Sequence, residues 1–153
     1  MSLSKFKFNT FVSYSRKNEN EVDQLCKFLK NEKYILWIDK EQVIYGDLAK
    51  IMEKGIDDSE YFLCCLSTSY SQGKNTLYEY NYAVAQGKKI IFVTFENFKW
   101  DEERKEKFKP IDMGRNIFYK YGKNDCFENI LKALKFVSYL LIFSIKFNRI
   151  YSS

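Results

Sequence analysis

The feature that most constrains the fold is a regular alternation between short apolar runs and amphipathic segments. Strand-like runs are predicted at residues 8–14, 34–38, 61–66, 90–95 and 116–121. The third of these runs is almost continuously apolar, as expected of a central strand that is covered on both faces. Strands that alternate with helices in this way predict an α/β fold with a parallel sheet and right-handed crossovers.

Between the predicted strands, apolar residues recur with helical spacing. Val22, Leu25, Cys26 and Leu29 follow the i, i+3, i+4, i+7 pattern of an amphipathic helix. A later helix that ends before Gly87 is predicted to bury Leu77, Asn81, Val84 and Ala85. Two more helices are predicted around residues 48–56 and 127–134, whereas the polar segment 67–76 is predicted to be a loop.

The length of 153 residues suits one folded domain. We expect that domain at residues 1–135, followed by an apolar C-terminal extension at 136–153. The extension is shorter than the roughly 20 apolar residues of a membrane-spanning helix, so membrane insertion is not expected. Either it forms a final helix that packs on the sheet, or it contacts a partner or a membrane surface.

The composition excludes several classes of site. The chain has no histidine, which excludes Ser–His and Cys–His nucleophiles and metals bound by histidine, and no metal site is expected. Its four cysteines have no CxxC spacing and are expected to be small buried hydrophobic residues in a reducing, cytoplasmic compartment. The net charge of +5 is spread along the chain without a basic stripe, so nucleic acid is not an expected partner.

Two segments carry groups that can act on a ligand. The first predicted strand leads into Ser13, Tyr14, Ser15 and Arg16, which are hydroxyls and a cation. The second segment, 77–83, is expected to place the Glu79 carboxylate off the apolar face of its helix. In a parallel α/β sheet the ends of the first and third strands meet in one crevice, so both segments are expected to face the same ligand.

These segments resemble the sequence boxes of the TIR (Toll/interleukin-1 receptor) domain family. The similarity covers roughly residues 6–121 and rests on four motifs, which are Phe11-Val12-Ser13-Tyr14-Ser15, Trp37-Ile38-Asp39 with the later Gly46, Leu66-Ser67-Thr68-Ser69-Tyr70, and Glu79 with Tyr82-Ala83. It implies a flavodoxin-like three-layer sandwich with a five-stranded parallel sheet in the order 2-1-3-4-5, which agrees with the predicted strands.

The resemblance also implies an activity. Many TIR domains are NAD⁺ nucleosidases that cut the nicotinamide–ribose bond, release nicotinamide and ADP-ribose or a cyclic variant, and act in signalling or defence after self-association. NAD would be the substrate, and no cofactor is implied. Nicotinamide leaves as a neutral molecule, so no general acid is needed. One carboxylate that stabilises an oxocarbenium-like transition state therefore suffices.

Residue roles follow from the same resemblance. Glu79 is the implied catalytic carboxylate, although it would otherwise be interpreted as a solvated residue near a helix N-terminus. The implied substrate-binding residues are Ser13, Tyr14, Ser15, Arg16, Leu48 and Asn75. From the residues themselves, Arg16 either pairs with a pyrophosphate or is a surface cation, Tyr14 either lines the site or packs beneath it, and the two serines either bind ligand hydroxyls or cap the turn.

A loop at 39–47 is implied to mediate homotypic TIR–TIR association through Asp39, Ile44, Tyr45 and Gly46, although a plain exposed connection fits the same residues. The chain also departs from catalytic members. Asn75 and Thr76 stand where many have Trp and Cys, and Leu48 stands where some have an aromatic residue. A non-catalytic module that recruits other TIR domains is therefore the alternative function, and a related nucleotide hydrolase or deoxyribosyl transferase is a third.

Overall fold

A five-stranded sheet forms the centre of the molecule, which is described here by a computed structural model of residues 5–42, 46–95, 98–108, 117–123 and 125–134. Its strands are β1 (Phe8–Ser13), β2 (Leu36–Trp37), β3 (Ser59–Leu66), β4 (Lys89–Thr94) and β5 (Ile117–Lys120). All neighbouring strands are parallel, and their order is β2-β1-β3-β4-β5. The predicted α/β class with a parallel sheet is confirmed.

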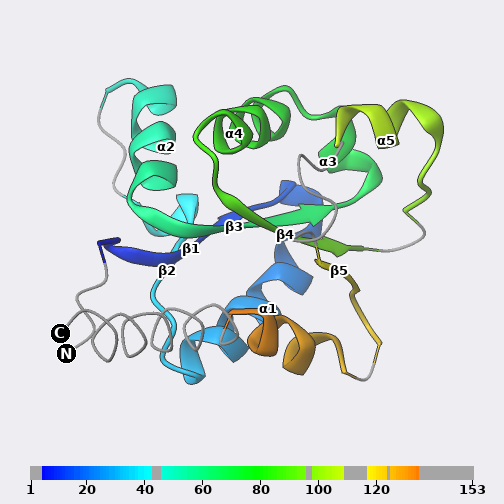
Figure 1. Cartoon of the computed structure of the whole chain (residues 1–153), viewed down its shortest axis with the longest axis horizontal. Coiled ribbons are helices and arrows are strands. Elements are labelled where there is room, and N and C mark those ends of the chain that lie inside the picture. Colours follow the sequence, from blue (N-terminus) through cyan, green and yellow to red (C-terminus); the bar gives the residue numbers. More distant parts are fainter. Residues whose placement is uncertain (1–4, 43–45, 96–97, 109–116, 124, 135–153) are drawn as a thin grey trace, which may run out of the picture.

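Helices cover both faces of the sheet and give three layers (Figure 1). On one face lie α2 (Leu48–Asp57), α3 (Thr68–Gln72), α4 (Lys74–Ala85) and α5 (Glu102–Lys107). On the other face lie α1 (Glu19–Asn31) and a helix at residues 126–134. Two short 3₁₀ helices, η1 (Arg16–Asn18) and η2 (Asp39–Glu41), follow β1 and β2.

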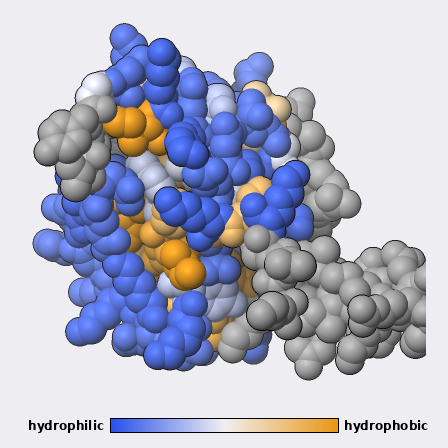
Figure 2. All heavy atoms as spheres, turned by 90° about the vertical axis from the view of Figure 1, so that its left-hand side faces the viewer, coloured by the Kyte–Doolittle hydropathy of each residue, from blue (hydrophilic) through white to orange (hydrophobic). Residues whose placement is uncertain are grey.

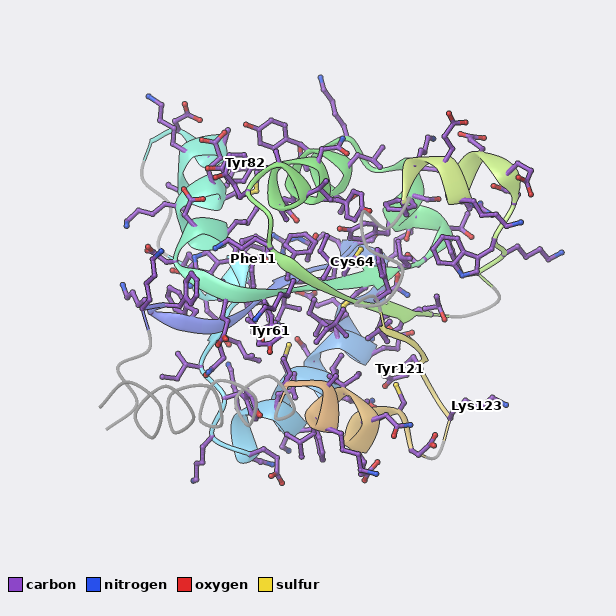
Figure 3. The ribbon with its side chains drawn as sticks, viewed as in Figure 1. Phe11, Tyr61, Cys64, Tyr82, Tyr121 and Lys123 are labelled. Carbon is purple, nitrogen blue, oxygen red and sulfur yellow. The ribbon has the colours of Figure 1, made fainter. Side chains whose placement is uncertain are left out.

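Successive residues of the central strand point to opposite layers, as the pleat of a strand requires. Phe62 and Cys64 pack in the core beneath α2 and α4, whereas Tyr61, Leu63 and Cys65 pack against α1. Figure 3 shows Cys64 and Tyr61 on these two sides of the sheet. The four cysteines are buried and free, as predicted.

The α1 pattern is confirmed, because Val22, Leu25, Cys26 and Leu29 are its buried residues. In α4 the buried residues are instead Thr76, Tyr80 and Ala83. The Tyr80 ring lies 5.0 Å from that of Phe108 between centroids, in an edge-to-face arrangement, and so buries a large apolar area. The predicted stripe was wrong: Leu77 and Val84 are only partly buried, and Asn81 and Ala85 are exposed.

The predicted loop at 67–76 was also wrong, because α3 and the start of α4 occupy most of it. The Ser67 side chain caps α3 by accepting a hydrogen bond from the Tyr70 backbone N–H at 3.1 Å. Gly87 follows α4 with φ of +68°, a backbone conformation that favours glycine, as predicted. No helix in the described part of the chain has the length and hydropathy of a membrane span, and residues 136–153 lie outside that part.

Candidate active site

The site lies where the carboxyl ends of β1 and β3 run side by side. Ser13, the last residue of β1, is in register with Cys64 of β3. From β1 the chain passes through α1 to β2 on one side, while β3 and then β4 lie on the other side. Ligands of open α/β sheets bind at this type of position, where the direction of strand progression reverses.

Glu79 reaches this strand end from α4. Ser13 Oγ donates a hydrogen bond to Glu79 Oε2 at 2.5 Å, and the Glu79 side chain is partly buried. Glu79 follows Thr76 by three residues and precedes Tyr80, both of which are buried, so it lies at the edge of the buried stripe. Glu79 is thus not one of the buried residues of α4, but it is not a solvated surface residue either.

Burial changes the acidity of this carboxyl group. Desolvation raises the pKa of Glu79 from 4.5 to about 7, since the charged form loses water that the protein replaces only in part. The hydrogen bond from Ser13 opposes this change, and the nearby negative charge of Asp39 adds to it. A carboxyl group in this state holds a substantial protonated fraction near neutral pH and is able to accept or release a proton.

A second hydroxyl continues the hydrogen-bonded group into the core. The Ser13 and Tyr70 hydroxyl oxygens are 2.7 Å apart and hydrogen-bonded to each other. Tyr70 is completely buried and packs against Phe108. Tyr70 was not predicted as a site residue, although its position in the segment directly after β3 is the signal that could have placed it there.

Asp39 lies on the neighbouring side of the same strand end. Its Oδ1 accepts a hydrogen bond from the Tyr14 hydroxyl at 3.0 Å, and its Oδ2 accepts one from Arg16 Nη2 at 2.9 Å. Burial and, next, the charge of Asp39 raise the pKa of Tyr14. Asp39 was predicted to be part of a self-association loop. Its carboxylate accepts hydrogen bonds from two of the predicted substrate-binding residues, Tyr14 and Arg16.

Ser15 accepts a hydrogen bond from the Lys17 backbone N–H at 3.4 Å and caps η1. Among the described hydrogen bonds, none joins Leu48 or Asn75 to Ser13 or Glu79, and both are exposed near the starts of α2 and α4.

The face of the molecule in Figure 2 is mainly hydrophilic and has small apolar patches. Gly46 is exposed with φ of +95°, and the predicted loop residues Ile44 and Tyr45 lie outside the described residues.

Thr76 ties α4 to α3. Its Oγ1 donates to the carbonyl oxygen of Tyr70 at 2.7 Å and lies 3.0 Å from that of Gly73. A Cβ atom at Gly73 would lie 2.4 Å from this hydroxyl, so glycine leaves the room that the threonine needs. The start of α4, the helix that carries Glu79, is thereby anchored to α3, the helix that carries Tyr70.

The arrangement defines a class of protein: a doubly wound α/β domain that holds a partly buried carboxylate beside the first strand end. No group of three or more Cys, Asp or Glu side chains within the described ranges is arranged to hold a metal ion. The sequence matches the family model of the TIR domain over residues 10–131. The chain therefore belongs to the TIR domain family.

A similar protein from Methanobrevibacter olleyae is named as the probable 2′ cyclic ADP-D-ribose synthase TcpO. It is 32% identical over 105 residues, which are 67% of this chain and 27% of that protein. The present chain thus spans about a quarter of the length of this relative.

Solved structures share the fold at low identity. The TIR domain of the Toll-related receptor TRR-2 from Hydra magnipapillata has a TM-score of 0.64 and 9% identity, over 84% of this chain and 99% of that one. The CMP N-glycosidase BcmB from Clostridium botulinum has a TM-score of 0.57 and 16% identity, over 81% and 98% of the two chains. A TIR-STING receptor from C. gigas has a TM-score of 0.64 and 13% identity, over 84% of this chain and 40% of that one.

Proposed function

We propose that this TIR domain cleaves the bond between nicotinamide and ribose in NAD⁺, with Glu79 as the catalytic carboxylate. The observation that carries the proposal is the Glu79 carboxyl group itself, which is partly buried and accepts a hydrogen bond from Ser13 at the strand end. The similarity to a protein named as a probable 2′ cyclic ADP-D-ribose synthase supports NAD as the substrate.

The chemistry needs only this group. When the C1′–N bond breaks, its electron pair goes to the pyridinium nitrogen, and nicotinamide leaves as a neutral molecule without a proton. Positive charge develops on the ribose, and the ionised Glu79 carboxylate stabilises it. A carboxylate in a partly desolvated position interacts more strongly with such a charge than one in water.

In the second step, a nucleophile attacks the ribose carbon C1′ and loses a proton. A water oxygen bonds to C1′ and gives its proton to Glu79, which yields ADP-ribose. If a hydroxyl group of ADP-ribose attacks instead, it gives up its proton in the same way and the product is cyclic. A carboxyl group with a pKa of about 7 is suited to accept this proton and then release it to solvent at neutral pH.

The residues after β1 have supporting roles in the proposal. Arg16 is exposed and bonded to Asp39 on one side of its guanidinium group, and it pairs with the pyrophosphate of the substrate. Tyr14 is held by Asp39 and forms a fixed wall beside Ser13. Ser15, Leu48 and Asn75 are proposed to contact the substrate farther from the bond that breaks.

Self-association through residues 39–47 is part of the same proposal. Asp47 caps α2 by accepting a hydrogen bond from the Ala49 backbone N–H at 3.0 Å, which fixes the end of this loop. The exposed Leu48 side chain next to it offers an apolar contact to a second copy. We propose that such assembly orders the substrate site, and that the domain acts in signalling or defence in the cytoplasm.

The experiment is an incubation of purified protein with NAD⁺, at low and high protein concentration, followed by chromatography of the products. We expect nicotinamide to appear with wild-type protein, and its rate to fall at least about 100-fold in Glu79→Gln. Glu106→Gln is the matched control, since Glu106 is an exposed residue of α5. Equal nicotinamide release by Glu79→Gln and wild type would reject the role of Glu79.

One observation favours the non-catalytic alternative. Leu48 and Asn75 occupy positions where catalytic members often have aromatic residues, and both are exposed. A domain that only recruits other TIR domains would leave NAD⁺ intact at every concentration tested. It would still self-associate in the same samples, which sedimentation measures.

A further inference from the structure

The hydrogen bonds around Glu79 form a chain with one proton at each link. Glu79 Oε2 lies 2.5 Å from Ser13 Oγ, which lies 2.7 Å from the Tyr70 hydroxyl. Ser13 and Tyr70 are each at most 1% exposed, so their hydroxyl protons have little access to water as an alternative partner.

Counting protons fixes the direction of the bonds. An ionised carboxylate only accepts hydrogen bonds, so Ser13 must donate its one proton to Glu79. The Ser13 oxygen is then free to accept, and the Tyr70 hydroxyl donates to it. When Glu79 is protonated, its own O–H can donate to Ser13, and Ser13 can then donate to the Tyr70 hydroxyl.

We infer that Tyr70 is a positioning residue for Glu79 and acts through Ser13, because its hydroxyl group supports the arrangement in which Ser13 donates to the carboxylate. The inference rests on the proposed function only in calling Glu79 catalytic. The bonding between the three side chains holds whether or not NAD⁺ is the substrate.

The ionised form depends more strongly on this chain than the protonated form. A hydrogen bond to a charged acceptor is roughly twice as strong as a neutral one, and neighbouring bonds in a chain strengthen each other. Removing the Tyr70 hydroxyl therefore weakens the Ser13–carboxylate bond more than it weakens the neutral chain. The Glu79 carboxyl group should then hold its proton to higher pH.

Other charged groups near Glu79 would remain in place. Asp39 is the charged neighbour from the segment after β2, and its own carboxylate is bonded to Tyr14 and Arg16. Tyr70 itself is anchored independently of its hydroxyl group by the bond from Thr76 to its carbonyl oxygen and by ring packing on Phe108. Tyr70→Phe keeps both anchors, so the substitution removes little besides the hydroxyl.

The test is a ¹³C NMR titration of the Glu79 carboxyl carbon, assigned by the loss of its signal in Glu79→Gln. We expect Tyr70→Phe to raise the titration midpoint by roughly half a pH unit to one pH unit, and Ser13→Ala to raise it further. Tyr80→Phe is the control and should leave the midpoint unchanged. Tyr80 is a buried tyrosine on α4 and has no described hydrogen bond to Ser13 or Glu79.

The double variant separates an action through Ser13 from a general structural effect. Once Ser13 is alanine, Tyr70→Phe should produce no additional shift, because the link that transmits its effect is gone. An equal shift in the presence and absence of Ser13 would overturn the inference, as would no shift in the single variant.

A measurement on the wild-type protein covers the case in which a variant fails to fold. The Cζ carbon of Tyr70 should titrate with the same midpoint as the Glu79 carboxyl carbon, because the tyrosine changes its hydrogen bonding when Glu79 ionises. A Tyr70 signal that stays constant from pH 5 to 9 while Glu79 titrates would overturn the inference. Neither titration requires NAD⁺ cleavage, so a failure of the proposed function would be seen separately.

Discussion

The two faces of the sheet hold their polar groups in different ways. On the α4 face, Ser13, Tyr70 and Thr76 are buried and make short side-chain hydrogen bonds among α3, α4 and the end of β1. On the α1 face, the contacts between α1 and η2 are ion pairs with partly exposed side chains, such as Lys40 with Asp23.

The cores beneath these groups differ as well. The α4 face is rich in rings, and Phe11 stacks between Trp37 and Phe62 with centroid separations of 4.3 and 5.5 Å. The α1 face is mainly aliphatic, with cysteines, and is packed by residues such as Leu25 and Leu29. Tyrosine side chains place hydroxyl groups inside the core of the α4 face. The Glu79 carboxylate is held partly away from water on the same face.

The largest expected effect on stability concerns Glu79 and pH. Its pKa is about 7 in the folded protein and near its ordinary value of 4.5 in the unfolded chain. Between these values the folded state holds a proton that the unfolded state has lost, so the free energy of unfolding falls as pH rises. Glu79→Gln imitates the protonated form and should be more stable than wild type at pH 8 by on the order of 1–3 kcal/mol.

Urea denaturation at pH 4 and pH 8 measures this difference, which should nearly vanish at pH 4. Glu128→Gln, at an exposed position in the helix on the α1 face, should show no comparable dependence. If Glu79→Gln were no more stable than wild type at pH 8, the α4 face would not hold a desolvated carboxylate, and this difference between the two faces would be lost.

A smaller effect is expected from the anchor of α4. Thr76→Val keeps the shape of the side chain but removes the hydroxyl that donates to the Tyr70 carbonyl at 2.7 Å. We expect the free energy of unfolding to fall by about 0.5–1.5 kcal/mol, the usual net value of one buried hydrogen bond. Thermal unfolding followed by circular dichroism measures this, and an unchanged midpoint would show that the bond does not hold α3 to α4.

The smallest effect is expected from the exposed ion pairs of the α1 face. Lys40 pairs with Asp23 and lies 3.8 Å from Glu19, and all three side chains are partly exposed. Lys40→Ala should cost only about 0.2–1 kcal/mol, and raising the salt concentration should reduce the difference from wild type. A loss that is larger than that of Thr76→Val and insensitive to salt would reverse the contrast between the faces.

The same contrast explains what the sequence could predict. The α1 stripe was predictable because Val22, Leu25, Cys26 and Leu29 are apolar, so that periodicity alone marks the buried side. The α4 stripe was not, since it contains Thr76 and Tyr80, whose burial depends on partners from other elements. Those partners, the Tyr70 carbonyl and the Phe108 ring, are not visible in the local pattern.

The candidate site was predictable to a similar degree. The topology of an α/β sheet was enough to bring the residues after β1 toward Glu79. The role of Asp39 was not foreseen, because its bonds to Tyr14 and Arg16 join residues 25 and 23 positions apart through the pairing of β1 with β2. Hydrogen bonds of this kind depend on tertiary geometry rather than on spacing along the chain.

The central claim is that the end of the α4 face holds Glu79 in a partly desolvated, hydrogen-bonded position. The most direct test is the titration midpoint of its carboxyl carbon in the wild-type protein. The structure predicts a midpoint of about 7. A midpoint near 4.5, the ordinary value for a solvated glutamate, would contradict the account.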